Sequence, residues 1–358
     1  MTSRRLTATS FLKSVLRRTK LLRVYISLRR RIDLYMKRRP HRSFRLTRRR
    51  DYSRSLALPG YWRFTAYVGT VLRAHIKLFG LLALIYAVLT IALVGMTSEE
   101  TYSELTGVIR MSGEETVSGG LGAIEQAGVI FLSAISGGFN AEADAAQQAY
   151  AGLIGLLTWL TSVWLLRAIL AGQKPRLRDG LYNAGAPIVP TFLISLVLIV
   201  QLLPLALAGL GYGAATASGL LEGGVEAMLF WLAAALLVAL SLYWATSTFV
   251  ALVVVTLPGM YPMQALRTAG DLVVGRRVRI LLRLLWVGVL VLVLWALIML
   301  PLIMADTWLK AAVPALAWIP IVPVSLLVLS SATVIVVAAY VYLLYRKVVE
   351  DDAAPATN

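Results

Sequence analysis

The stretch ILLRLLWVGVLVLVLWALIMLPLIM, residues 280–304, decides the fold class of this chain. Arg283 is its only charged residue, and a helix needs about 20 apolar residues to cross a hydrocarbon core of about 30 Å. The stretch therefore predicts a transmembrane helix. Five further stretches have the same character, so we predict six spans, near residues 75–96, 149–171, 186–209, 228–257, 280–304 and 321–345.

Composition agrees with this prediction. Hydrophobic residues make up 59% of the chain, whereas soluble domains are about 45–50% apolar. The chain has no cysteine, which excludes thiol nucleophiles, disulfides and cysteine-based metal sites. Its two histidines, His41 and His75, stand far apart in the sequence. We predict an all-α integral membrane protein with a membrane domain over residues 66–346 and a flexible tail over 347–358.

The net charge of the chain is confined to its first 65 residues. They carry 20 Lys and Arg against two acids, while residues 66–358 carry 15 against 16. The connections 172–185 and 258–279 are also basic, whereas 97–148 is acidic and 210–227 has no base. Because basic connections stay in the cytoplasm, we expect both termini there, in a bacterial cytoplasmic membrane.

The basic segment over residues 1–65 is predicted to contain a helix and, near its end, a turn. Apolar residues recur at helical spacing in 9–36, with Lys and Arg between them, which predicts an amphipathic helix at the membrane surface. Leu58–Trp62 is expected to form a turn.

A short apolar stretch at 127–135 is too short to span the membrane, and we expect it either on the outer surface or in a re-entrant segment. The connection at 262–275 is expected to be a short interfacial helix that begins at Pro262.

Clustered cations near spans are candidates for contact with anionic headgroups or phosphates. They are Arg29, Arg30, Arg31, Lys37, Arg38, Arg39, Arg48, Arg49, Arg50, Arg276, Arg277 and Arg279. The same cations could hold nucleic acid through its phosphates, but no RNA-binding motif accompanies them. We therefore expect membrane lipids as partners before nucleic acid, together with a membrane-protein partner or a second copy of the chain.

Two short patterns recur at an offset of 85 residues. Trp159-x-Thr161-Ser162 matches Trp244-x-Thr246-Ser247, and Leu181-x-x-Ala184-Gly185 matches Leu266-x-x-Ala269-Gly270. These matches predict that spans 2–3 and spans 4–5 are copies of one unit in the same orientation. Such a parallel repeat differs from the inverted repeats of many secondary transporters.

The segment PGMYPMQALRTAGDLVVGRRVRILLRLL, residues 258–285, resembles a cytoplasmic connection of the YciC-like proteins and of the membrane domain on some glycerophosphodiester phosphodiesterases. The resemblance rests on the residues that those families share with this chain, Ala265, Leu266, Leu272, Gly275, Arg276 and Arg279. It implies a polytopic membrane domain. The chain contains no phosphodiesterase catalytic domain, so the resemblance implies no enzymatic activity.

Little in the spans has catalytic chemistry. Gln201 is the deepest strongly polar side chain, and Arg167 and Arg283 lie about one turn from the basic ends of their spans, where they can snorkel. The chain has no phosphate loop, no G-x-S-x-G elbow and no H-E-x-x-H motif. We expect a scaffold or accessory subunit without enzymatic activity or cofactor. The alternatives are a transporter or channel component that uses the hydroxyl groups of spans 4 and 6, and a tether for nucleic acid or ribosomes.

Overall fold

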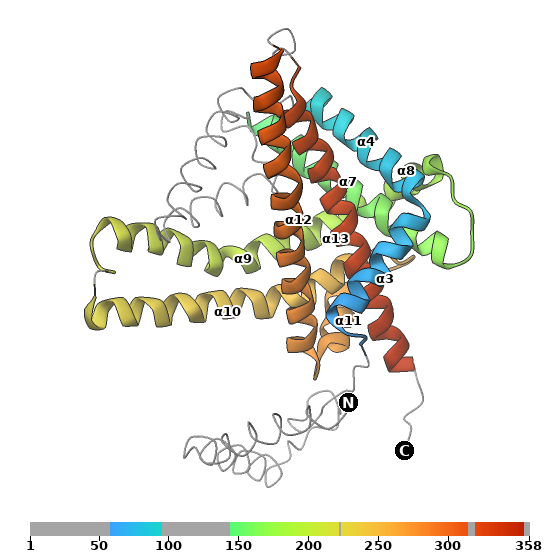
Figure 1. The fold of residues 1–358 in the computed structure, drawn as a ribbon. Helices are drawn as coiled ribbons and strands as arrows, with labels where there is room; N and C mark the ends of the chain where they lie inside the picture. Colours follow the sequence, from blue (N-terminus) through green and yellow to red (C-terminus); the bar gives the residue numbers. More distant parts are fainter. Residues whose placement is uncertain (1–57, 95–143, 222, 314–318, 354–358) are drawn as a thin grey trace, which may run out of the picture. The chain divides into compact units, whose positions relative to one another are not determined.

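The computed structural model describes residues 58–94, 144–221, 223–313 and 319–353, and the regular structure within these ranges is helical (Figure 1). Six of its helices are long and apolar enough to cross a membrane, which confirms the predicted all-α fold with six spans. These helices are α4 (Ile76–Leu93), α7 (Ala145–Leu170), α9 (Ile188–Ala217), α10 (Gly224–Val254), α12 (Arg277–Ala312) and α13 (Ile321–Ala353). The helix expected at 9–36, the stretch 127–135 and residues 354–358 lie outside the described ranges.

Local capping explains where α7 begins and ends. The Asp144 side chain accepts a hydrogen bond from the backbone of Ala145, while Gln147 accepts one from the backbone of Asp144, so the first turn is closed by a capping box. At the other end, Gly172 adopts a positive φ of 79°. This left-handed residue lets Gln173 bond back to the carbonyl of Ala168 and ends the helix.

Three shorter helices connect or precede the long ones. They are α3 (Tyr61–Ala74), α8 (Leu177–Ala184) and α11 (Pro262–Val273). The helix predicted for the 262–275 connection is confirmed as α11. The turn expected at Leu58–Trp62 is wrong, because Tyr61 and Trp62 already form the first turn of α3. The apolar residues Phe64 and Val68 of α3 are buried, and this packing favours a helix where local sequence suggested a turn.

The described helices belong to one compact unit of residues 56–273 and 277–358. Helix α13 is central to its packing, since it contacts α3, α4, α7, α10 and α12. Its stretch 338–344 is buried throughout. The helix also continues to Ala353, through residues that the sequence assigned to a flexible tail. Glu350 pairs there with Arg346 and Lys347 one turn earlier, which supports the additional turn.

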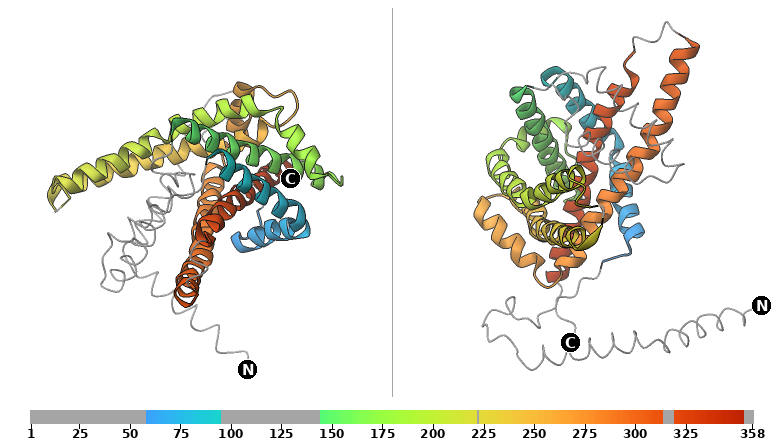
Figure 2. Two further views of the ribbon diagram at one scale, coloured as in Figure 1. Left: turned by 90° about the horizontal axis from the view of Figure 1, so that it is seen from above. Right: turned by 90° about the vertical axis from the view of Figure 1, so that its left-hand side faces the viewer.

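Helices α9 and α10 form an antiparallel hairpin whose two arms lie side by side in both Figure 1 and Figure 2. Among the described residues the hairpin is most buried toward the end of α10, where residues 250–254 are all buried. Farther along, both arms expose large apolar side chains, among them Leu207, Leu210, Leu232 and Leu236. Hydrocarbon is the environment in which such a surface is stable.

The two segments matched at an offset of 85 residues have the same local layout. In each, a long helix is followed by a short one that packs on it, α8 on α7 and α11 on α10. Helix α8 begins at Leu177 and α11 begins at Pro262, again 85 residues apart. Ala184 in α8 and Ala269 in α11 are both buried.

Candidate functional site

A groove runs along one face of α7. Its larger part is a cavity of about 750 Å³ between α7 and the first turns of α9, with Leu252 of α10 and Val334 of α13 also in its wall. Almost all of the wall is apolar. The α7 residues that line it include Gly152, Gly155 and Trp159.

A second cavity of about 530 Å³ follows at the basic end of α7. The α7 residues of its wall are Leu160, Trp164 and Arg167, and the α8–α9 and α10–α11 connections provide the rest. On α7 the lining residues of the two cavities recur every three or four positions from Ala149 to Arg167. Residues at this spacing share one face of a helix, so the two cavities follow one another along α7.

Three of the four polar side chains in the wall of the larger cavity, all except Tyr150, are already hydrogen-bonded within the protein. Trp159 donates its indole N–H to the carbonyl of Leu252 at 3.3 Å. Thr191 donates to the carbonyl of Pro187, and Ser195 donates to that of Thr191. Since these donors are occupied, this part of the groove presents an effectively hydrocarbon surface.

Arg167 is the cation of the groove. Its Nη1 donates a hydrogen bond to the carbonyl of Thr256, at the end of α10, at 2.9 Å. The side chain is half-buried and also lines the second cavity together with Asn183. The sequence predicted that Arg167 would snorkel toward water, but the structure holds one edge of its guanidinium against a neighbouring helix.

Arg283 differs more strongly from that expectation. It is only 6% exposed, and it donates a hydrogen bond to the carbonyl of Pro59, just before α3. Its guanidinium carbon lies 4.1 Å from the centre of the Tyr61 ring. Trp286, on the same helix, donates to Thr65 of α3 at 3.0 Å. Arg283 therefore does not snorkel, because the residues at and just before the start of α3 supply both an acceptor and an aromatic face for it.

Polar side chains of the α9–α10 hairpin bond to one another. Gln201, the polar residue singled out from the sequence, accepts a hydrogen bond from Thr248 at 2.6 Å. Ser241 accepts one from the backbone of Leu205 at 3.0 Å, next to the proline inside α9. A proline disturbs the helical hydrogen-bond ladder, and a hydroxyl from a neighbouring helix can satisfy the groups it frees. Both contacts have a structural role.

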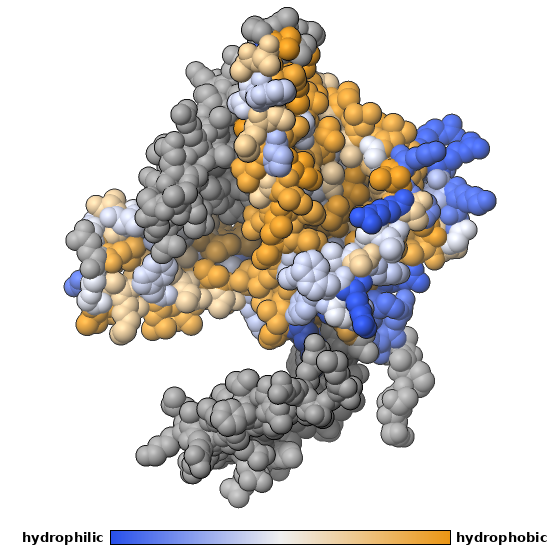
Figure 3. Space-filling view, viewed as in Figure 1, coloured by the Kyte–Doolittle hydropathy of each residue, from blue (hydrophilic) through white to orange (hydrophobic). Residues whose placement is uncertain are grey.

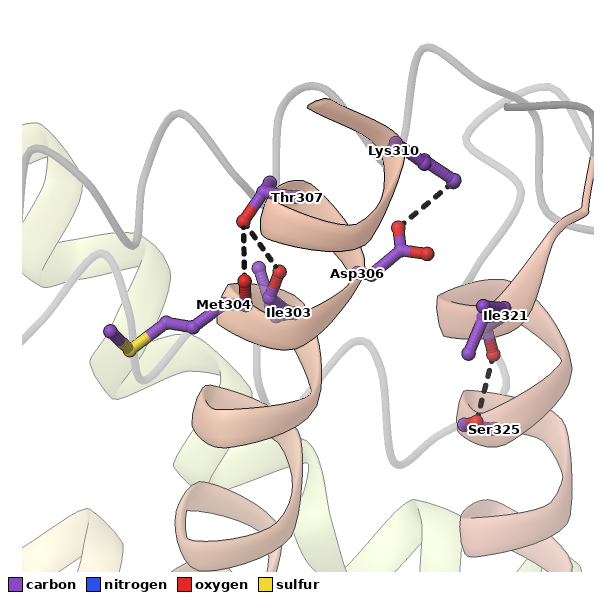
Figure 4. Close-up of polar contacts among 7 residues, drawn as sticks. All are labelled: Ile303, Met304, Asp306, Thr307, Lys310, Ile321 and Ser325. Carbon is purple, nitrogen blue, oxygen red and sulfur yellow. Dashed lines mark hydrogen bonds and ion pairs between the residues drawn. The ribbon is translucent and has the colours of Figure 1, made fainter. Parts of the chain in front are cut away.

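An ion pair closes the far end of α12 (Figure 4). The Asp306 side chain has 0% exposure, and Lys310, one turn later, reaches it at 2.8 Å. In the same view Thr307 donates to the carbonyls of Ile303 and Met304. The span predicted from the sequence ends near residue 304. Helix α12 instead extends to Ala312, so Asp306 becomes a buried residue of the helix.

The basic residues predicted to contact headgroups are only partly described. Arg29, Arg30, Arg31, Lys37, Arg38, Arg39, Arg48, Arg49 and Arg50 lie outside the described residues. Arg277 stacks on the ring of Tyr243 at 3.9 Å, and Arg279 is exposed. Arg276 is only 2% exposed.

Within the described ranges no group of three or more His, Cys, Asp or Glu side chains is arranged to hold a metal ion. The groove along α7 was not found from the sequence, because its walls come from four helices. Its one local signal is the pair Gly152 and Gly155, which share a face with Leu156 and Trp159. Neither a protein-family model nor a curated protein nor a solved structure matches this chain.

Proposed function

We propose that the protein is a membrane scaffold or accessory subunit without catalytic activity. In this proposal both termini are cytoplasmic, and the basic N-terminal segment lies on the inner leaflet of a bacterial cytoplasmic membrane. The observation that carries it is the placement of α3, α8 and α11. If the six long helices cross the membrane in turn, these three helices and the C-terminal end of α13 all fall on one side.

Each of these short helices has the character of an interfacial helix. Small or apolar residues are buried on one face, such as Ala265 and Ala269 of α11. Large aromatic side chains remain exposed elsewhere on or next to these helices, including Trp62 (69%) in α3, Tyr182 (86%) in α8 and Tyr261 (74%) just before α11. Aromatic rings of this kind favour the headgroup region. Figure 3 shows hydrophilic residues gathered around α3, α8 and the end of α13, while α12 is covered mainly by hydrophobic ones.

The hydroxyl groups of α10 and α13 support a scaffold over a transporter. Thr246 and Ser247 of α10 donate to carbonyls of their own helix. So do Ser325, Ser330 and Thr333 of α13. A hydroxyl bonded to its own helix contributes little to a polar permeation path. A scaffold requires no such path.

The sidedness can be tested by single cysteines, because the chain has none. We would place them at exposed positions, Tyr182 and Met263 on the proposed cytoplasmic side and Ser218 and Thr307 on the other. In intact cells a membrane-impermeant maleimide should label Ser218→Cys and Thr307→Cys only. Labelling of Tyr182→Cys from outside would contradict the proposed topology.

The anchoring role is tested by hydrogen exchange of residues 1–57 in the full chain, in nanodiscs of phosphatidylglycerol and of phosphatidylcholine. We expect protection in phosphatidylglycerol that is lost at high salt and in the variant Arg48→Gln/Arg49→Gln/Arg50→Gln. Binding of a labelled RNA at matched salt is measured in parallel. If RNA protects the segment at a concentration ten times lower than lipid does, the tether alternative replaces the anchor. Solute flux through proteoliposomes would replace the scaffold with a transporter.

A further inference from the structure

We propose that the groove along α7 binds one phospholipid molecule, with its phosphate at Arg167 and an acyl chain in the larger cavity. This site requires only that the six long helices lie in a bilayer. It does not depend on the scaffold role or on the basic N-terminal segment.

The larger cavity fits hydrocarbon. Its wall is almost wholly apolar, and Trp159, Thr191 and Ser195 already donate to backbone carbonyls. A polar solute beside these three side chains would lose its hydration without gaining a hydrogen bond from them, which is unfavourable. An acyl chain loses no hydration, because it moves from one hydrocarbon environment to another, and it gains close contacts with the wall.

The length of the groove fits a lipid of one leaflet. Fourteen residues separate Leu153, in the wall of the larger cavity, from Arg167 in that of the smaller. At 1.5 Å per residue this is about 21 Å of helix. One leaflet contributes about 15 Å of hydrocarbon. Trp159, the α7 residue of the larger cavity nearest to Arg167, is eight positions or about 12 Å of helix away, so an acyl chain anchored by its headgroup at Arg167 enters the larger cavity without reaching its far end.

The smaller cavity fits the headgroup. Arg167 donates from Nη1 to Thr256, and a guanidinium has five N–H donors in all. Its planar, permanently charged fork suits a phosphodiester. This end of the groove lies beside the α8–α9 and α10–α11 connections, and the second of these carries the exposed ring of Tyr261. The opposite end, near Tyr150, has no charged residue in its wall.

The structure offers a variant that fills the groove without disturbing the fold. A Cβ at Gly155 would meet no atom within 4 Å, so leucine there would extend into the groove. Leucine is also a better helix former than glycine. Gly288 of α12 is a matched control, because it too is a helical glycine with open space at Cβ, and it does not line either cavity.

The test is native mass spectrometry of the full chain, delipidated in mild detergent and incubated with phosphatidylglycerol or with diacylglycerol, which lacks the phosphate. Wild type and Gly288→Leu should each retain one phosphatidylglycerol through detergent exchange, and Gly155→Leu should bind it at least tenfold more weakly. Arg167→Gln should lose about tenfold in affinity for phosphatidylglycerol and nothing for diacylglycerol, because charged hydrogen bonds contribute about 1.5–3 kcal/mol.

Two results would overturn the proposal. If Gly155→Leu retains phosphatidylglycerol as well as wild type does, the lipid is not in this groove. If wild type binds diacylglycerol as tightly as phosphatidylglycerol, Arg167 does not hold the phosphate. Both results are independent of the exchange measurement on residues 1–57, so the groove and the anchoring role can fail separately.

Discussion

Replacing Gly180 by alanine would show how closely α8 packs on α7. A Cβ at this position would lie 2.9 Å from both Cγ and Cδ2 of Leu165 and 3.3 Å from Cγ2 of Thr161. Leu165 and Thr161 are both 0% exposed, so neither can move aside freely. Overpacking a buried site costs about 1–3 kcal/mol, whereas alanine gains about 1 kcal/mol over glycine in a helix. We expect a net loss of about 1 kcal/mol in the free energy of unfolding.

The chain itself suggests the compensating change. At an offset of 85 residues from Leu165 and Gly180 stand Val250 and Ala265, both buried where α11 packs on α10. At the corresponding positions a smaller valine and a larger alanine stand in place of leucine and glycine. If the two helix pairs are copies of one unit, Leu165→Val should relieve the crowding caused by Gly180→Ala. The free energy of unfolding of the double variant should be about 1 kcal/mol higher than the value obtained by adding the effects of the two single variants.

Unfolding can be followed by circular dichroism while dodecyl sulfate is titrated into mixed micelles. The control is Gly270→Ala in α11, where a Cβ would meet nothing within 4 Å, and which should be neutral or stabilising by up to about 1 kcal/mol. The reasoning is refuted if Gly180→Ala is as stable as this control. It is equally refuted if the effects of Leu165→Val and Gly180→Ala are additive.

Three further changes test the other polar contacts. Arg283→Gln should release the start of α3, since a cation–π contact of about 0.5–2 kcal/mol and a charged hydrogen bond are lost; faster hydrogen exchange over residues 61–74 would show it, and unchanged exchange would contradict it. Thr248→Val should lower the free energy of unfolding in mixed micelles by about 0.6 kcal/mol, and at most by about 1.7 kcal/mol. The loss should be smaller when Gln201→Leu is also present. Equal losses with and without Gln201→Leu would mean that the two side chains are not coupled. Asp306→Asn removes the carboxylate charge that Lys310 contacts at 2.8 Å and should lower the apparent Tm in detergent, whereas an unchanged Tm would show that this ion pair adds no net stability.

The six spans could be predicted from the sequence because hydropathy is a local property. Their ends could not, because a helix does not stop where hydrocarbon stops. Helix α9 continues through Pro204 to Ala217, and α12 continues through Asp306 to Ala312. A hydropathy window detects the residues that lie in hydrocarbon, whereas backbone hydrogen bonds and capping residues determine where a helix begins and ends. The prediction of a turn at Leu58–Trp62 failed for a related reason, since the packing of Phe64 on α13 is not local.

The partners of the charged residues are also remote in sequence. Arg283 bonds to Pro59, which lies 224 positions earlier, and Arg167 bonds to Thr256, which lies 89 positions later. From sequence alone, each could be placed only by its distance from a span end, and that distance favoured snorkelling. Snorkelling and burial against a partner both satisfy a guanidinium near the interface. Only the packing of α3 and α10 decides between them.

The same limit explains why the groove had no clear signature. A polar residue in a span attracts attention, but Gln201 bonds to the neighbouring α10, Thr246 and Ser325 bond to their own helices, and none of the three lines either described cavity. The groove forms instead where the small residues Gly152 and Gly155 of α7 face helices that come from distant parts of the sequence. An apolar cavity of this size would destabilise a protein in water, but in a bilayer lipid chains can fill it. A membrane protein can therefore keep such a hollow without loss of stability, and a cation at its end is what turns general contact with lipid into recognition of a headgroup.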